Sequence, residues 1–257
     1  MEALDSPFMR IPAEIRLLIY SFLLNDGGYK QLTLRNHPEG RLKESKGVRR
    51  TRYRVLEQSL LRRCYETTYH LTSPGAEMHT AILATSRQVY DEAAHILYGK
   101  HSFDFGPDIE AVVPFLADRT PRSRPLIGEI SIYKRGPLPF LESDRYEWAH
   151  LCRFLSSTGS VRKLRLVVEG GRPSDPWDGP QELSESDLRL LTLVRHESLD
   201  WVSELAQVKG IRELEVVPDL QYYPTPRTTS MIIFAAFSAS IESGLTQFLR
   251  RQLNIIS

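Results

Sequence analysis

The stretch VRKLRLVV (161–168) decides how the second half of this chain folds, because two other segments repeat its pattern. Without gaps, IGEISIYK (127–134) and IRELEVVP (211–218) align with it, and all three have apolar residues at positions one, four and six. Positions four and six are two residues apart, which places their side chains on one face of a β-strand. These apolar residues are Ile127, Ile130 and Ile132; Val161, Leu164 and Leu166; and Ile211, Leu214 and Val216.

A helical pattern precedes each of the three repeats. The helical segments are PDIEAVVPFLAD (107–118), YEWAHLCRFLSS (146–157) and ESLDWVSELAQV (197–208). Since helices alternate with strands that begin 34 and 50 residues apart, the sequence predicts parallel α/β packing. The pattern resembles an irregular leucine-rich-repeat array of parallel strands and helices. We therefore expect residues 106–257 to form an α/β repeat-like domain, capped at its ends by neighbouring helices.

Two further segments shape the expected organisation. TAILATSRQVYDEAAHILYG (80–99) has apolar residues at helical spacing, and we expect Thr80 to cap this helix and Gly99 to end it. Residues 169–187 are rich in Gly and Pro and carry six Asp or Glu against one Arg, which predicts an acidic loop.

The overall composition favours a folded protein inside the cell. The chain has 257 residues, 41% of them hydrophobic, and a net charge of +1, which gives no strong field toward nucleic acid or membrane. Its two cysteines cannot build a disulfide framework, and MEALDSPFMR lacks the basic start of a signal peptide. We expect a cytoplasmic or nuclear protein with no nucleic-acid or membrane partner.

A basic insertion of about residues 29–63 interrupts the first half of the chain. Between Arg35 and Arg54, eight Lys or Arg stand against two Glu. Three interpretations remain open: a solvated insertion that pairs with the acidic loop, a nuclear-localisation or acidic-partner contact, and a phosphate contact. An acidic partner would bind through Arg49, Arg50, Arg52 and Arg54.

The known catalytic motifs of hydrolases, nucleotide-binding enzymes and metalloproteases do not occur in the sequence. Cys64, His70 and His79 do not match a standard zinc spacing. We therefore predict a non-enzymatic protein with no catalytic residues, no metal site and no cofactor. An active site assembled from distant residues is the alternative that motifs do not address.

The segment IPAEIRLLIYSFLL (11–24) is nearly all apolar and begins with a proline in the first helical turn. A surface helix needs a polar face, and this one has only Glu14, Arg16 and Ser21. Both of its sides must therefore be covered, either by the rest of its own domain or by a partner.

Two segments together resemble a known family. IPAEIRLLIYSFLL resembles the opening of an F-box, and ILATSRQVYDEAAHILYGKHSFDF (82–105) resembles the second signature of a group of mostly uncharacterised fungal F-box-like proteins. That signature is matched by Leu83, Ser86, Arg87, Gln88, Val89, Tyr90, Glu92, Ala93, Leu97, Tyr98, Phe103 and Phe105. The resemblance covers residues 8–105 and implies an F-box-like helical module with a basic insertion.

The resemblance implies a function for the apolar helix. In an F-box, one side of the first helix packs on its own domain and the other packs on the Skp adaptor of a cullin-RING ubiquitin ligase. By that likeness, the chain is a substrate receptor that holds a client with its second half. The adaptor-binding residues would be Ile11, Pro12, Ile15, Ile19, Phe22 and Leu23. The alternative is a free-standing structural or interaction domain in which this helix is wholly internal.

Overall fold

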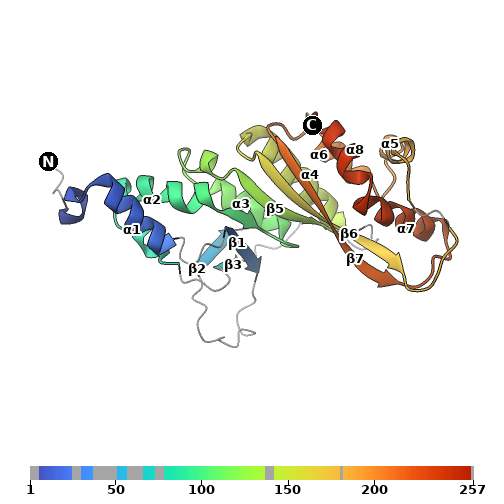
Figure 1. The fold of residues 1–257 in the computed structure, drawn as a ribbon, viewed down its shortest axis with the longest axis horizontal. Helices are drawn as coiled ribbons and strands as arrows, with labels where there is room; N and C mark the ends of the chain where they lie inside the picture. The colour runs from blue at the N-terminus through green and yellow to red at the C-terminus, as the bar shows by residue number, and fades with distance from the viewer. Residues whose placement is uncertain are drawn as a thin grey trace. The chain divides into compact units, whose positions relative to one another are not determined.

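The computed structural model describes residues 6–24, 30–36, 51–56, 66–72, 78–136, 142–179 and 182–255. Within these residues, eight α-helices and seven β-strands form a mixed α/β fold (Figure 1). The chain divides into two compact units, Met1–Phe103 with Ala117–Ile127, and Asp104–Leu116 with Gly128–Ser257. The sequence placed the boundary between residues 105 and 106; in the structure, residues 117–127 belong with the first unit.

The first unit is not purely helical. It contains α1 (Ala13–Leu24) and α2 (Arg87–Lys100), the strands β1 (Gln31–Asn36), β2 (Thr51–Leu56) and β3 (Glu66–Thr72), and the first two residues of β4 (Ser102–Asp104). The strand order is β2-β3-β1-β4, and β3 pairs antiparallel with both β1 and β2. The expectation of a helical module was therefore wrong for this part of the chain, because backbone pairing extends into the region predicted as a basic insertion.

The helix predicted over residues 80–99 is divided into two parts. A 3-10 turn covers Thr80–Ala84, and α2 begins after Ser86, whose Oγ accepts a hydrogen bond from the backbone N–H of Val89 at 3.2 Å. Ser86 has the extended backbone that an N-cap requires. The prediction of one continuous helix capped by Thr80 was therefore wrong. Gly99 lies inside α2 without a left-handed φ, and α2 ends at Lys100 instead.

In the second unit, the three repeats form adjacent parallel strands. They are β5 (Glu129–Lys134), β6 (Lys163–Pro173) and β7 (Glu213–Tyr223). The register pairs Ile130 with Leu164 and Leu164 with Leu214, and it likewise brings Ile132, Leu166 and Val216 together. The gapless alignment of the repeats is thus their register in space, and the prediction of parallel strands is confirmed. The likeness to leucine-rich repeats stays a prediction.

The same hydrogen bonds start each successive strand. The carbonyl oxygen of Gly128 accepts from the N–H groups of Arg162 (2.8 Å) and Lys163 (2.9 Å). The carbonyl oxygen of Arg162 accepts from those of Arg212 (2.6 Å) and Glu213 (3.0 Å). The accepting and donating positions are 34 and 50 residues apart, as the repeats are, so each strand sets the starting point of the next.

Helices precede the strands where the sequence predicts them: α3 (Val112–Ala117), α4 (Glu142–Thr158) and α6 (Asp200–Leu205). Trp148 of α4 is 1% exposed, and its indole N–H donates to the carbonyl oxygen of Trp201 in α6 at 3.0 Å. The two indole rings meet edge to face, 5.7 Å apart. This contact fixes α4 against α6 behind the strands.

The predicted acidic loop is shorter than expected. Strand β6 continues to Pro173, and a fifth helix, α5 (Glu185–Leu193), begins inside the segment. Ser184 and Asp187 form a capping box, each side chain accepting from the backbone N–H of the other residue. Acidic residues at a helix N-terminus are stabilised by the helix dipole, which explains why part of this acidic segment is ordered.

The C-terminal helices are α7 (Thr229–Glu242) and α8 (Leu245–Gln252) (Figure 1). Helix α7 packs on β6 and β7, and Gly170 permits the close approach. A Cβ atom there would lie 2.7 Å from Leu220 and 3.0 Å from Ile241. In the described part of the chain no single helix is long and apolar enough to cross a membrane. Helices α7 and α8 taken together are long and apolar enough, but the pair is bent by 82°.

Strand β7 ends the order β5-β6-β7. The N–H of Glu213 points to β6, and the carbonyl of Leu214 points away and accepts from Arg250 of α8 at 3.1 Å. Because backbone groups alternate along a strand, Pro218 also lies on the outward side, where its missing N–H breaks no bond to β6.

Candidate docking surface

Helix α1 has an inner face that is held by polar side chains as well as apolar ones. Its buried residues are Arg16, Tyr20 and Leu24, four residues apart, so they line one side of the helix. Arg16 is 7% exposed, and Tyr20 and Leu24 are fully buried. A buried arginine requires a partner, and the second helix supplies it.

Glu92 of α2 receives three hydrogen bonds from α1. The Nε of Arg16 donates to Glu92 Oε2 at 2.9 Å, and its Nη2 donates to Oε1 at 2.6 Å. The hydroxyl of Tyr20 donates to Oε2 at 3.0 Å. Both carboxylate oxygens face the planar guanidinium, which is the strongest ion-pair geometry available to these side chains. The two partners lie 76 positions apart in the chain, so the pair joins two separate helices.

Further contacts position the ends of α1. The Nη1 of Arg16 donates to the carbonyl oxygens of Met9 (3.2 Å) and Ile11 (2.5 Å), which fixes the chain entering the helix. At the other end, the N–H of His79 donates to the carbonyl oxygen of Leu23 at 2.9 Å. One guanidinium therefore joins the entry segment, α1 and α2, and holds α1 in a defined orientation.

The ion pair changes the titration of its members. The hydrogen bonds from Arg16 lower the pKa of the Glu92 carboxyl, and the same contact raises the pKa of Arg16. Burial, together with the carboxylate of Glu92, raises the pKa of Tyr20 to about 12. At neutral pH the cluster is a cation, an anion and a neutral phenol donor, which suits the observed hydrogen bonds.

Acid should weaken this cluster. The pKa of the Glu92 carboxyl is lower in the folded chain than its ordinary value of 4.5. Such a carboxyl stabilises the fold at pH values above 4.5, and this contribution is lost as the pH falls through the pKa of the folded state. We expect the melting temperature to fall between about pH 6 and about pH 3, and to fall less steeply in Glu92→Gln. Thermal denaturation followed by circular dichroism measures the melting temperature of the wild type and of Glu92→Gln at each pH. An equal dependence on pH in the two proteins would contradict the role given to Glu92.

The outer face of α1 is apolar and open to solvent. Ile15 is 48% exposed, Leu18 53% and Phe22 65%. These three residues are spaced i, i+3 and i+7, so their side chains form one row along the helix. We call Ile15, Leu18 and Phe22 the outer row. Isolated exposed apolar side chains are ordinary, whereas a continuous row of large ones marks an interaction surface.

The six residues predicted to bind an adaptor are distributed around this row. Ile15 and Phe22 belong to it, Ile19 and Leu23 are half-buried, and Pro12 is exposed near the start of the helix. Ile11 is half-buried. Leu18 and Leu17, which is 40% exposed, were not among the six predicted residues. The helical spacing from Ile15 and Phe22 was the signal that could have identified Leu18.

The basic cluster predicted to meet an acidic partner is only partly described. Arg49 and Arg50 lie outside the described residues, as does Cys64. Arg52 and Arg54 lie in β2, where their backbones pair with His70 and Thr68 of β3. Within the described residues, no group of three or more His, Cys, Asp or Glu is placed to hold a metal ion.

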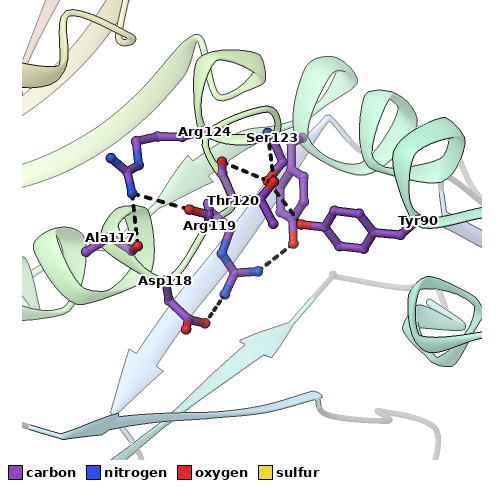
Figure 2. Close-up of polar contacts among 8 residues, drawn as sticks. Tyr90, Ala117, Asp118, Arg119, Thr120, Ser123 and Arg124 are labelled. Carbon is purple, nitrogen blue, oxygen red and sulfur yellow. Dashed lines mark hydrogen bonds and ion pairs between the residues drawn. The ribbon is translucent and has the colours of Figure 1, made fainter. Parts of the chain in front are cut away.

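The two signature tyrosines of α2, Tyr90 and Tyr98, anchor the segment that follows α3. Figure 2 labels Tyr90 and its partners in this segment. The hydroxyls of Tyr90 and Ser123 are hydrogen-bonded at 3.0 Å. The hydroxyl of Ser123 is also hydrogen-bonded to that of Thr120, at 2.8 Å. Arg119 donates to the hydroxyl of Tyr98 at 2.5 Å and to the carboxylate of Asp118 at 2.6 Å. This network explains why residues 117–127 belong with the first unit.

Many residues of the second signature have structural roles of this kind. Ser86 caps α2, Glu92 binds Arg16, and the two tyrosines hold the segment after α3. The other signature residues that are buried in the core are Val89, Ala93, Leu97, Phe103 and Phe105. Among the described residues, no such contact is found for the outer row.

Residues 2–202 match a protein family described as a domain of unknown function, DUF7730. The chain belongs to this family. The matched range includes α1, α2 and the strands β1 to β6, and it stops before β7. Neither the curated proteins nor the solved structures include a significant match to the chain.

Proposed function

We propose that this DUF7730 protein is a non-enzymatic, F-box-like adaptor, which docks a Skp-type adaptor through α1 and serves as a substrate receptor of a cullin-RING ubiquitin ligase. The observation that carries the proposal is the outer row, in which Ile15, Leu18 and Phe22 are each about half exposed or more. A stable partner would remove these side chains from water, which is the main favourable term in protein association.

The ion pair between the helices supports this role. Arg16 and Glu92 fix α1 on α2 from its inner side, so the outer row is presented by a helix whose orientation is already set. A preorganised surface loses less conformational freedom on binding, and more of its contact energy remains as affinity. The motifs that resemble an F-box are therefore the motifs that would hold the docking helix in place.

The parallel unit would then hold the client. Its three strands are in register, as in a short leucine-rich-repeat-like array, and their charged residues alternate with the buried ones. Glu129, Lys163 and Glu213 lie side by side across the sheet, with Lys163 within 4.0 Å of both carboxylates. Repeat arrays of this kind provide extended surfaces for binding proteins.

A binding assay with the purified Skp adaptor tests the docking role. We expect the wild-type chain to bind and Leu18→Asp or Phe22→Asp to weaken binding by about a hundredfold, since each would place an unpaired carboxylate in an apolar interface. Because both side chains are exposed, the variants should keep the wild-type melting temperature.

Ala13→Asp is the matched control, because it adds the same charge in the exposed first turn of α1, where an acidic residue is tolerated. It should bind as the wild type does. Failure of the wild type to bind, or equal binding by all variants, would support the alternative instead: a free-standing interaction domain without ligase docking.

A further inference from the structure

A second surface, far along the chain from α1, has the shape of a binding site. It is a hollow of 410 Å³ at the carboxyl ends of β6 and β7, where open α/β sheets commonly bind their ligands. Volumes in this range are typical of pockets that bind small molecules or side chains. Its walls are mainly aromatic, proline and methionine side chains: Tyr223, Pro224, Pro226, Met231 and Phe234.

The hollow is built into the fold. Gly171 at its base leaves room for two aromatic rings, because a Cβ there would lie 2.6 Å from Tyr223 and 2.7 Å from Phe234. These rings meet edge to face at 5.9 Å. The N–H of Gly171 donates to Ser238 Oγ at 2.8 Å, which fixes the strand to α7. The apolar walls are thus preformed.

The first turn of α7 supplies one wall. The side chain of Thr228 caps this helix by accepting from the N–H of Met231 at 3.3 Å. Met231 is half-buried and lines the hollow. Methionine adapts its shape to different apolar groups, and it is common at surfaces that accept several sequences.

The charges at this hollow are negative. Glu197 lines it, is exposed, and forms no ion pair with the described residues. Behind the aromatic wall, burial and then the carboxylates of Glu169 and Asp219 raise the pKa of Tyr223. Arg172 lines the adjoining hollow but is paired with Glu242 at 2.8 Å, and Arg227 follows Pro226 without lining the first hollow. A ligand that is apolar and carries a cation complements these features.

The surface extends beyond one side chain. A second hollow of 370 Å³ shares Gly171, Pro173 and Ala235 with the first. It is also lined by Asp175, by Trp177 and by Arg172, whose charge is balanced by its ion pair with Glu242. Two adjoining hollows with common walls can accept two side chains of one extended segment, as peptide-binding grooves do.

We propose that the two adjoining hollows at the carboxyl ends of β6 and β7 bind an extended peptide segment of a partner protein, in which an apolar anchor residue lies next to Lys or Arg. The anchor enters between Tyr223, Met231 and Phe234, and the cation pairs with Glu197. This goes beyond the adaptor role of α1, and it holds whether or not α1 docks a ligase.

Selection from a phage library of random peptides of about 12 residues, with the full chain as the target, tests this. We expect enriched peptides to carry an aromatic or aliphatic residue within about three positions of Lys or Arg. Synthetic copies of these peptides should then bind in fluorescence polarisation, and Glu197→Lys and Met231→Glu should each weaken binding about tenfold or more.

Tyr222 and Tyr223 give a matched pair of variants. Tyr222 is 74% exposed and points to the opposite face of β7, so Tyr222→Ala should bind normally and Tyr223→Ala weakly. Melting temperatures separate lost binding from lost folding. Glu197→Lys should keep the wild-type melting temperature, because the side chain of Glu197 is exposed.

Several results would overturn the proposal. They are a selection without enrichment, enriched peptides without a basic residue, and affinities that are unchanged in Glu197→Lys and Met231→Glu. A dimer in sedimentation that Met231→Glu dissociates would identify a second copy of the chain as the occupant instead. None of these outcomes depends on the binding assay with the Skp adaptor.

Discussion

Glu92→Ala is expected to lower the melting temperature by roughly 5 to 10 °C, because it leaves a guanidinium buried without its carboxylate. Arg16 is 7% exposed and donates twice to Glu92, and Tyr20 would lose its acceptor as well. The side chain of Glu92 itself retains 23% exposure, so water would enter and moderate the loss. Circular dichroism melts of purified variants give the measurement.

Asp91 provides the matched control for this prediction. It precedes Glu92 on the same helix and pairs with Arg122 at 3.3 Å, but the Arg122 side chain is 84% exposed. Ion pairs at the surface contribute little, so Asp91→Ala should change the melting temperature by no more than about 2 °C. A comparable fall in melting temperature in Glu92→Ala and Asp91→Ala would mean that the contact with Arg16 stabilises the fold no more than a surface ion pair does.

A double variant separates the ion pair from general packing. Arg16→Met with Glu92→Leu replaces both charges by apolar side chains, a change that often preserves stability. We expect the double variant to melt above Glu92→Ala although it contains one more substitution. Since α1 would keep its place, the outer row should still bind the adaptor if the proposed function holds.

Trp148→Ala is expected to cost about 3 to 5 kcal/mol in the free energy of unfolding, the usual range when a buried tryptophan is removed. The side chain is 1% exposed and joins α4 to α6 through its ring and its N–H. Urea denaturation followed by circular dichroism should show the loss. Trp148→Phe should recover part of it, because it keeps an aromatic ring but not the hydrogen bond to Trp201.

Tyr146, two residues earlier on α4, is the control. Its side chain is 53% exposed and stacks on His150, with the ring centroids 6.3 Å apart. Tyr146→Ala should cost less than about 1 kcal/mol, as surface substitutions usually do. Similar losses in the two alanine variants would show that α4 is not fixed through Trp148.

The second unit was largely predictable because its information is local and repeated. Apolar spacing assigned Ile130, Leu164 and Leu214 to strands, and aligning the three segments placed these residues opposite one another. Parallel strands separated by helices have few possible arrangements, so a correct alignment also gives the register. The capping box at Ser184 also depends only on neighbouring residues, but the acidic composition of residues 169–187 led to the prediction of a loop there.

The first unit was harder to predict because its decisive contacts join distant residues. Arg16 and Glu92 are 76 positions apart, and each alone is typical of a helix surface. The strands β1 and β2 come from the predicted basic insertion, whose composition favoured an irregular structure. Pairing with another strand overrode that composition, which single-segment propensity does not capture.

The candidate docking surface was predicted in part. The apolar helix and two members of its outer row, Ile15 and Phe22, followed from composition and from the resemblance to an F-box. The division of the helix into inner and outer faces did not, because it depends on where Arg16 finds its carboxylate. Once that pair is known, helical geometry places Leu18 in the row and moves Ile19 and Leu23 to its margin.

The last strand of the sheet has a consequence for how these molecules behave at high concentration. An uncovered strand edge invites pairing between molecules, and such pairing can continue into fibres. On β7, the proline at position 218 removes an outward donor in mid-strand, and Arg250 occupies the outward carbonyl of Leu214. A second molecule would find a broken ladder there, so the protein carries its own safeguard against aggregation by edge pairing.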